Sequence, residues 1–185
     1  EPAAFVPTAE PQPCPASSPA ELECWTVAVP VDPADPSGAT LDLGVTTYRA
    51  DPTAWNSPVL KILSHAQAFL LGPDATVEHF GDHDLIWIDH RGQGRSAAYP
   101  RCDELATHAA QLNTIQIDDE LAQLLRDCVQ PTLTADVPLS TVMDQDVSAN
   151  DFELVRQALG IDQWAIYAAS LGTDIALRMI EQHPD

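Results

Sequence analysis

Hydrophobic and polar positions along the chain predict five β-strands. Residues 24–30 and 41–48 alternate in polarity and are rich in β-branched and aromatic side chains, and a Pro/Asp/Gly turn region separates them, which is typical of an antiparallel pair. Residues 58–63, 85–88 and 164–168 are short, nearly continuous apolar runs. Runs of this kind indicate strands covered on both faces of a sheet.

Helical periodicity appears between these strands. We expect one helix over about 103–127, with an interruption near Thr114, a second over about 144–159, and a third from the residues after Ser170 to about His183. Gly160 is a natural stop for the second helix. Strands separated by helices predict an α/β fold, with a mostly parallel, doubly wound sheet and the first hairpin at its antiparallel edge.

Composition divides the chain into a lead-in and a core. Residues 1–20 are rich in Pro, Ala and Ser, so we expect an extended, weakly ordered segment there and the folded core over 21–185. The chain begins at Glu1 without methionine, and we expect that a signal peptide was removed. No apolar run approaches the roughly 20 residues that cross a bilayer, so no membrane span is predicted. The protein is expected to be secreted or periplasmic.

The four cysteines favour disulfides. They form an even set without a C-x-x-C pair, which argues against a zinc ribbon or a thioredoxin-type site. Two disulfides fit an exported protein, whereas four buried thiols would fit a cytoplasmic one. Local spacing suggests Cys14 with Cys24 and Cys102 with Cys128, although three pairings are open to four cysteines.

Charge excludes one class of partner. The 28 acidic and 8 basic residues give a net charge of −20, which would repel phosphate backbones, so nucleic-acid binding is not expected. An acidic surface can steer cationic substrates such as peptide N-termini, but a solvated surface suited to export explains the same charge. Nothing in the sequence implies a cofactor.

Ser170 is the strongest candidate for chemistry. It follows the apolar run 164–168 and precedes a helical pattern, and this order matches a nucleophile elbow, the sharp strand-to-helix turn that exposes a catalytic serine. Such a turn needs small residues two positions before and after the serine; Gly172 provides one, and Ala168 replaces the usual glycine. The alternative is an ordinary turn or N-cap serine.

A second motif is Asp89-His90-Arg91-Gly92-Gln93-Gly94-Arg95-Ser96. It lacks the third glycine of a dinucleotide-binding fingerprint, and no clear strand with a ribose-binding acid follows it, so we reject a Rossmann site. A rigid turn held by Asp89 and Arg91 is the preferred interpretation. Residues 78–84 place two histidines four apart among acids, but a polar surface loop explains them better than a metal site.

These motifs, in this order, resemble those of secreted α/β-hydrolases of the tripeptidyl aminopeptidase and proline iminopeptidase group. The resemblance covers most of residues 14–185. It rests first on a strand of the form C-x-T-V-x-V-P-x-D at Cys24–Asp32, and on a D-x-R-G-x-G-x-S turn at Asp89–Ser96 with Cys102 shortly after it. A helix close to D-x-E-x-x-R-x-A-L-G follows at Asp151–Gly160. The serine motif at Tyr167–Ala176 and a closing H-P-D at His183–Asp185 complete the match.

The resemblance implies the N-terminal half of such an enzyme, with Ser170 as nucleophile and the backbone N–H groups of Leu171 and Gln67 as oxyanion donors. The loop His65-Ala66-Gln67-Ala68-Phe69 replaces the His-Gly-Gly-Pro-Gly of that group, so side chains occupy a loop where glycines are usual. In this family the acid, the general-base histidine and the substrate-recognising lid all follow the serine. None of the six histidines is assigned as the base.

Two functions follow as expectations. The first is a secreted serine hydrolase of peptidase or esterase type, complete only with a C-terminal half or partner subunit. The second is a non-catalytic derivative of the same fold, without a triad, that binds a partner or assembles with copies of itself through the exposed edge of an unfinished sheet.

Overall fold

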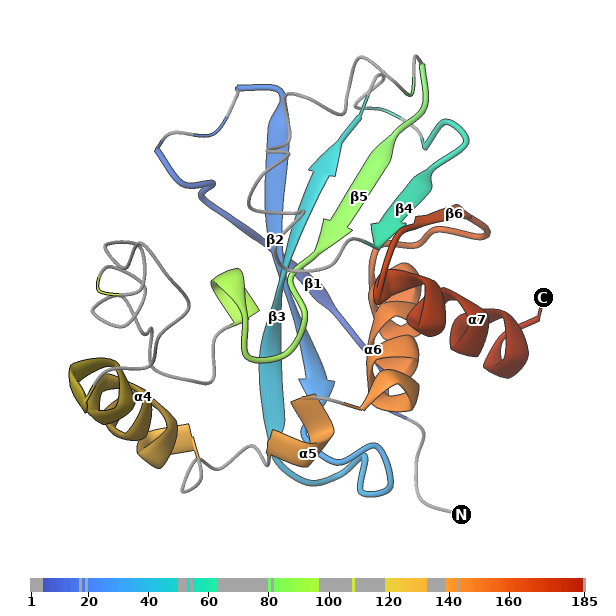
Figure 1. Ribbon diagram of the computed structural model, residues 1–185. Coiled ribbons are helices and arrows are strands. Elements are labelled where there is room, and N and C mark those ends of the chain that lie inside the picture. The colour runs from blue at the N-terminus through green and yellow to red at the C-terminus, as the bar shows by residue number, and fades with distance from the viewer. Residues whose placement is uncertain are drawn as a thin grey trace.

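The computed structural model describes residues 5–16, 18, 20–49, 53, 55–62, 80, 82–96, 108, 119–132, 139–142 and 144–184. Its strands are β1 (Ala9–Gln12), β2 (Leu22–Pro30), β3 (Thr40–Tyr48), β4 (Val59–Ile62), β5 (Leu85–Ile88) and β6 (Ala165–Ala168). Its helices are α4 (Asp119–Thr132), α5 (Leu139–Val142), α6 (Gln145–Ala158) and α7 (Gly172–Gln182), with a short 3₁₀ turn over Gly94–Ser96 (Figure 1).

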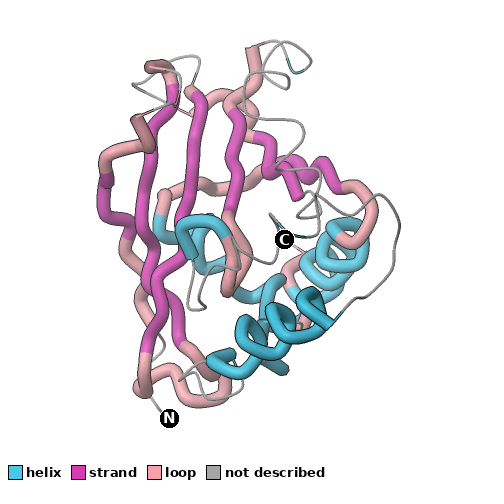
Figure 2. Tube along the Cα trace, turned by 60° about the vertical axis from the view of Figure 1, so that its left-hand side comes forward, coloured by secondary structure: helices cyan, strands magenta, loops and turns pink. Residues whose placement is uncertain are grey.

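The strands form one mixed sheet in the order β1-β2-β3-β5-β4-β6. The pairs β1/β2, β2/β3 and β3/β5 are antiparallel, whereas β4 pairs in parallel with both β5 and β6. Figure 2 shows the long strands β2 and β3 side by side. The α/β class expected from the sequence is therefore confirmed, with antiparallel N-terminal strands and parallel later ones.

The lead-in contains a strand that the sequence did not predict. β1 pairs antiparallel with β2, and Gln12 lies opposite Cys24 in the register. A disulfide joins Cys14 to Cys24, one of the two pairings that local spacing suggested. The strand could not be recognised in this Pro/Ala-rich segment, because β1 has no alternating apolar pattern. Three of its four residues are exposed.

The core lies between the sheet and helices α6 and α7. On β4, Leu60 and Ile62 are at most 1% exposed, and they belong to the same buried cluster as Phe152 and Val155 of α6 and Met179 of α7. Figure 1 shows the two helices beside each other next to β4 and β6. Burial of both faces of β4 explains why its sequence reads as a continuous apolar run.

Local signals set the bounds of α6. Asp144 caps the helix, because its side chain accepts hydrogen bonds from the backbone N–H groups of Asp146 and Val147. At the other end Gly160 adopts a φ of 65°, in the left-handed region that favours glycine. The expected bounds, 144–159, differ from the observed ones by one residue at each end.

The first expected helix falls only partly within the described residues. α4 begins at Asp119 and continues to Thr132, five residues beyond the expected end. Of the expected residues before Asp119, only His108 is described. Cys128 of α4 is disulfide-bonded, and its expected partner, Cys102, lies outside the described residues. No helix within the described ranges is long and apolar enough to cross a membrane.

Candidate active site

Ser170 occupies a strained turn between β6 and α7. Its φ is 54°, a left-handed value that is uncommon for a residue other than glycine. The residue is exposed. Backbone strain of this kind costs about 1–3 kcal/mol and persists only where the surrounding structure imposes it. The turn therefore presents the Ser170 hydroxyl to solvent at the carboxyl end of a parallel strand.

Close packing of strand and helix explains the small residue after the turn. A Cβ atom placed on Gly172 would lie 2.3 Å from the carbonyl oxygen of Ile62, at the end of β4. The same carbonyl accepts a hydrogen bond from the Ala169 N–H at 3.1 Å. Helix α7 thus begins in direct contact with the backbone of β4, and a side chain at position 172 would push the two apart.

The turn has two backbone N–H groups, those of Ser170 and Leu171, that make no hydrogen bond with a described residue. The N–H groups of Gly172 and Thr173 donate to the carbonyls of Ala169 and Ser170, each at 3.0 Å. The N–H of Leu171 makes no hydrogen bond with any described residue, and the Leu171 residue is 66% exposed. The resemblance described above implies that this N–H is an oxyanion donor. The second assigned donor, Gln67, lies outside the described residues, as does the whole loop 65–69.

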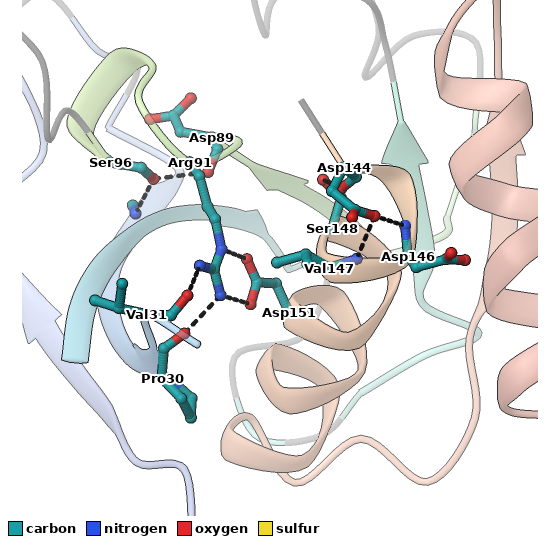
Figure 3. A network of polar contacts seen from close by, with 11 residues as sticks. Pro30, Val31, Asp89, Arg91, Ser96, Asp144, Asp146, Val147, Ser148 and Asp151 are labelled. Carbon is teal, nitrogen blue, oxygen red and sulfur yellow. Dashed lines mark hydrogen bonds and ion pairs between the residues drawn. The ribbon is translucent and has the colours of Figure 1, made fainter. Parts of the chain in front are cut away.

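The turn after β5 is held by Asp89. Its carboxylate accepts a hydrogen bond from the Arg95 N–H at 2.9 Å. Its carbonyl accepts one from the Ser96 hydroxyl at 2.6 Å (Figure 3). A Cβ atom on Gly94, whose φ is 50°, would lie 2.5 Å from the Asp89 carboxyl carbon. Glycine is required here because the turn folds around that carboxylate.

Arg91 reaches beyond this turn to join three segments. Its guanidinium donates to both carboxylate oxygens of Asp151 on α6, at 2.5 and 2.7 Å, and to the carbonyls of Pro30 and Val31 at 2.6 Å each (Figure 3). The Arg91 and Asp151 side chains are only 1% and 2% exposed. The pair fixes α6 against the ends of β2 and β5, and it does so within the interior.

Among the described residues, no histidine is hydrogen-bonded to Ser170. His83 hydrogen-bonds the Ser57 carbonyl at 2.9 Å, and His90 packs edge-on against Phe152. His183 ends α7, so its distance from the turn is about the length of an 11-residue helix, roughly 16 Å. His65 and His79 lie outside the described residues.

A metal site receives no support from the part of the chain that is described. No group of three or more His, Cys, Asp or Glu side chains is placed there to hold an ion. In the segment 78–84, the Asp84 carboxylate instead accepts a hydrogen bond from the Asn56 N–H at 2.6 Å.

A hollow of about 320 Å³ lies at the end of α7 remote from Ser170. Its lining includes Trp164, Ile166, Met179, Ile180 and His183. The Nε2 atom of His183 is buried without a hydrogen-bond partner among the described residues. Because this hollow adjoins the outer strand β6 rather than the Ser170 turn, it is not part of the candidate active site.

Comparison with known families identifies the fold family of this chain. A family model described as the alpha/beta hydrolase fold matches residues 64–185, which is more than half of the chain and includes Ser170. The chain belongs to the α/β-hydrolase fold family. No curated protein matches the chain. The family match names no narrower group, so membership in the aminopeptidase group belongs to the proposal below.

Within this α/β-hydrolase chain, sequence reasoning missed Lys61. The residue interrupts the apolar run of β4, and it is the only lysine in the chain. It is 4% exposed in the structure and is surrounded by aromatic rings. A single charged residue inside a run that reads as fully buried was the available signal.

Proposed function

We propose that this chain supplies the nucleophile of a secreted serine hydrolase that cleaves peptide bonds near an N-terminus, or esters. The observation that carries the proposal is the left-handed φ of the exposed Ser170 between β6 and α7. An ordinary N-cap serine has an extended backbone and bonds the helix through its side chain. Ser170 differs, because the cap position of α7 is Leu171 and no side-chain cap bond is made.

The turn suits acyl transfer. The Ser170 hydroxyl would attack the substrate carbonyl, and the developing oxyanion would accept a hydrogen bond from the backbone N–H of Leu171. The alcohol or amine leaves, and water then hydrolyses the acyl-enzyme. Removal of one oxyanion donor in such sites costs about 2.7–4 kcal/mol of transition-state stabilisation. The replacement of glycines in the loop 65–69 therefore bears directly on the rate.

The remaining triad members would come from a C-terminal half, in the same precursor or in a second chain. In α/β-hydrolases the acid and the histidine follow the nucleophile in chain order. Secretion is supported by the Cys14–Cys24 disulfide and by the disulfide-bonded Cys128, because disulfides persist mainly in oxidising compartments. The −20 charge suits a substrate with a cationic amino terminus.

The test is turnover of a p-nitrophenyl ester and of peptides with a free N-terminus by the natural protein that contains this sequence. Ser170→Ala is expected to lose at least about 1000-fold in kcat, since the nucleophile is removed. Ser37→Ala is the matched control, because Ser37 is an exposed turn serine whose hydroxyl donates a hydrogen bond to Asp35. Equal turnover by the two variants would overturn the proposal.

A second candidate function is a binding or self-assembling subunit. One observation favours it: within the described residues β6 pairs on one side only, with β4, and large apolar side chains nearby are exposed. Leu171, Leu177 and Ile180 are 66%, 60% and 58% exposed. An uncovered strand edge beside such side chains invites pairing with another chain.

The two functions differ in solution behaviour. A binding or self-assembling subunit would form oligomers or a stable complex, and it would show no turnover. The double variant Leu177→Glu with Ile180→Glu would dissociate these assemblies. Sedimentation velocity of the natural protein measures this directly. A monomer with Ser170-dependent turnover would contradict the second function.

A further inference from the structure

Lys61 lies in a cluster of aromatic side chains. Its Nζ atom is 5.2 Å from the ring centroid of Phe80, 5.5 Å from that of Trp87 and 6.0 Å from that of Tyr167. No carboxylate among the described residues lies within ion-pair distance of this amine, and no hydrogen bond to it is formed there. Among the described residues, these three rings are the main neighbours of the Lys61 amine.

The position of Lys61 in the sheet explains this cluster. Lys61 pairs in parallel register with Trp87 on β5 and with Tyr167 on β6, so the three side chains lie on one face of adjacent strands. Phe80 packs edge-on against Tyr167 at 5.3 Å. Tyr167 is 48% exposed, and Phe80 and Trp87 are partly exposed, so the cluster reaches the surface of the described part.

An amine in these surroundings is chemically different from a surface lysine. Burial lowers the pKa of Lys61 to about 8. At pH 8 about half of such an amine is neutral, compared with about 0.4% of an ordinary lysine with a pKa near 10.4. The neutral form carries the lone pair that attacks electrophiles, whereas the protonated form is inert.

The same surroundings favour loss of the charge. Aromatic faces attract a cation, but they offset only part of the cost of removing it from water when no anion is near. Conversion of the amine to an amide eliminates that cost and leaves a neutral group among three rings. Methylation would keep the charge, so an acyl group fits the cluster better than a methyl group.

We propose that Lys61 is a covalent modification site whose Nζ accepts a small acyl group from a thioester. The neutral amine attacks the thioester carbonyl, the new C–N bond forms as the C–S bond breaks, and the thiolate leaves with the electron pair. The amine proton passes through solvent to the thiolate. The products are an amide on Lys61 and a free thiol, with no change of oxidation state.

The first test uses the acetyl thioester of N-acetylcysteamine and the whole natural protein, folded or in concentrated urea. Acetylation of Lys61 is followed by peptide mass spectrometry across a pH series from about 7 to 11. In the folded protein the rate is expected to be half-maximal near pH 8. At that pH it is expected to exceed the rate in urea by roughly tenfold, because the larger neutral fraction outweighs the lower basicity of the amine.

Variants at Tyr167 separate reactivity from accessibility. Tyr167→Phe keeps the ring over the amine and is expected to keep the midpoint near pH 8. Tyr167→Ala admits water, so its midpoint is expected to move upward toward that of the unfolded chain. The proposal is overturned if folded Lys61 reacts more slowly than in urea at every pH, or if all variants share a midpoint above pH 10.

A stability comparison gives a second, independent test. Lys61→Gln, a neutral mimic of the acylated residue, is expected to have a higher melting temperature than Lys61→Arg, which keeps a permanent charge in the cluster. The reverse order would contradict the argument that this position favours loss of the charge. Neither test involves Ser170 turnover, so their outcomes are independent of the proposed hydrolase activity.

Discussion

Removal of one partner of the Arg91–Asp151 pair is expected to destabilise the fold strongly. Both side chains are at most 2% exposed, so Asp151→Asn leaves the Arg91 charge in the interior without its counter-ion. Breaking a buried pair in this way costs about 3–5 kcal/mol. Arg91→Met is expected to cost more, because the carbonyls of Pro30 and Val31 also lose their donors, at about 1–3 kcal/mol for each buried group left unsatisfied.

Urea denaturation followed by circular dichroism measures these costs. With an m-value of about 2–2.5 kcal/mol per molar urea, a loss of about 4 kcal/mol lowers the midpoint by about 1.5–2 M. The double variant Arg91→Met with Asp151→Leu is expected to recover part of the loss, since it leaves no uncompensated charge.

The matched control is Asp146→Asn, which removes one partner of an exposed ion pair with Arg178 at 3.7 Å. Pairs of this kind contribute about 0–1 kcal/mol, so its midpoint is expected to stay close to that of the natural protein. If Asp151→Asn and Asp146→Asn lower the midpoint equally, the claim that the buried pair fixes α6 to the sheet is refuted.

Three further outcomes are expected. Gly172→Ala should destabilise the fold by more than about 2 kcal/mol, because its Cβ would overlap a β4 carbonyl. Gly160→Ala should cost only roughly 1–2 kcal/mol for its left-handed backbone, because a Cβ there meets nothing within 4 Å. Equal urea midpoints for the two variants would contradict this. Replacement of Cys14 and Cys24 by serine should cost about 2–3 kcal/mol in the same assay, and no change would show that the disulfide does not constrain the unfolded chain. Because the pKa of Lys61 is lowered in the folded state, the unfolded chain binds more protons than the folded one between about pH 8 and 10.5. This residue should therefore make the free energy of unfolding rise with pH in that range. Lys61→Met should abolish the rise, and an unchanged slope would contradict the lowered pKa.

Much of the fold could be predicted from local patterns. The strand 85–88 has the observed bounds, and the other expected strands differ by one or two residues at their ends. Helix α6 was predictable because its cap, Asp144, and its stop, Gly160, both lie in the local sequence. β1 was missed because it is held by pairing with β2, which no local pattern reports.

The candidate active site was also predictable from the sequence only in part. The turn at Ser170 could be predicted because it depends on consecutive residues, a strand, a small residue and a helix. The Arg91–Asp151 pair could not, since its partners are 60 residues apart and meet only through packing of α6 on the sheet. The rings around Lys61 likewise depend on the strand order β5-β4-β6, which brings distant segments together.

The central claim is that Ser170 is a reactive nucleophile, and labelling with a fluorophosphonate tests it most directly. The natural protein is treated with the probe, and the adduct is located by intact-mass and peptide mass spectrometry, with Ser170→Ala and Ser37→Ala treated in parallel. A single adduct on Ser170, lost in Ser170→Ala and kept in Ser37→Ala, is the expected result. A protein that stays unlabelled at Ser170 while its fold and oligomeric state are intact would contradict the account.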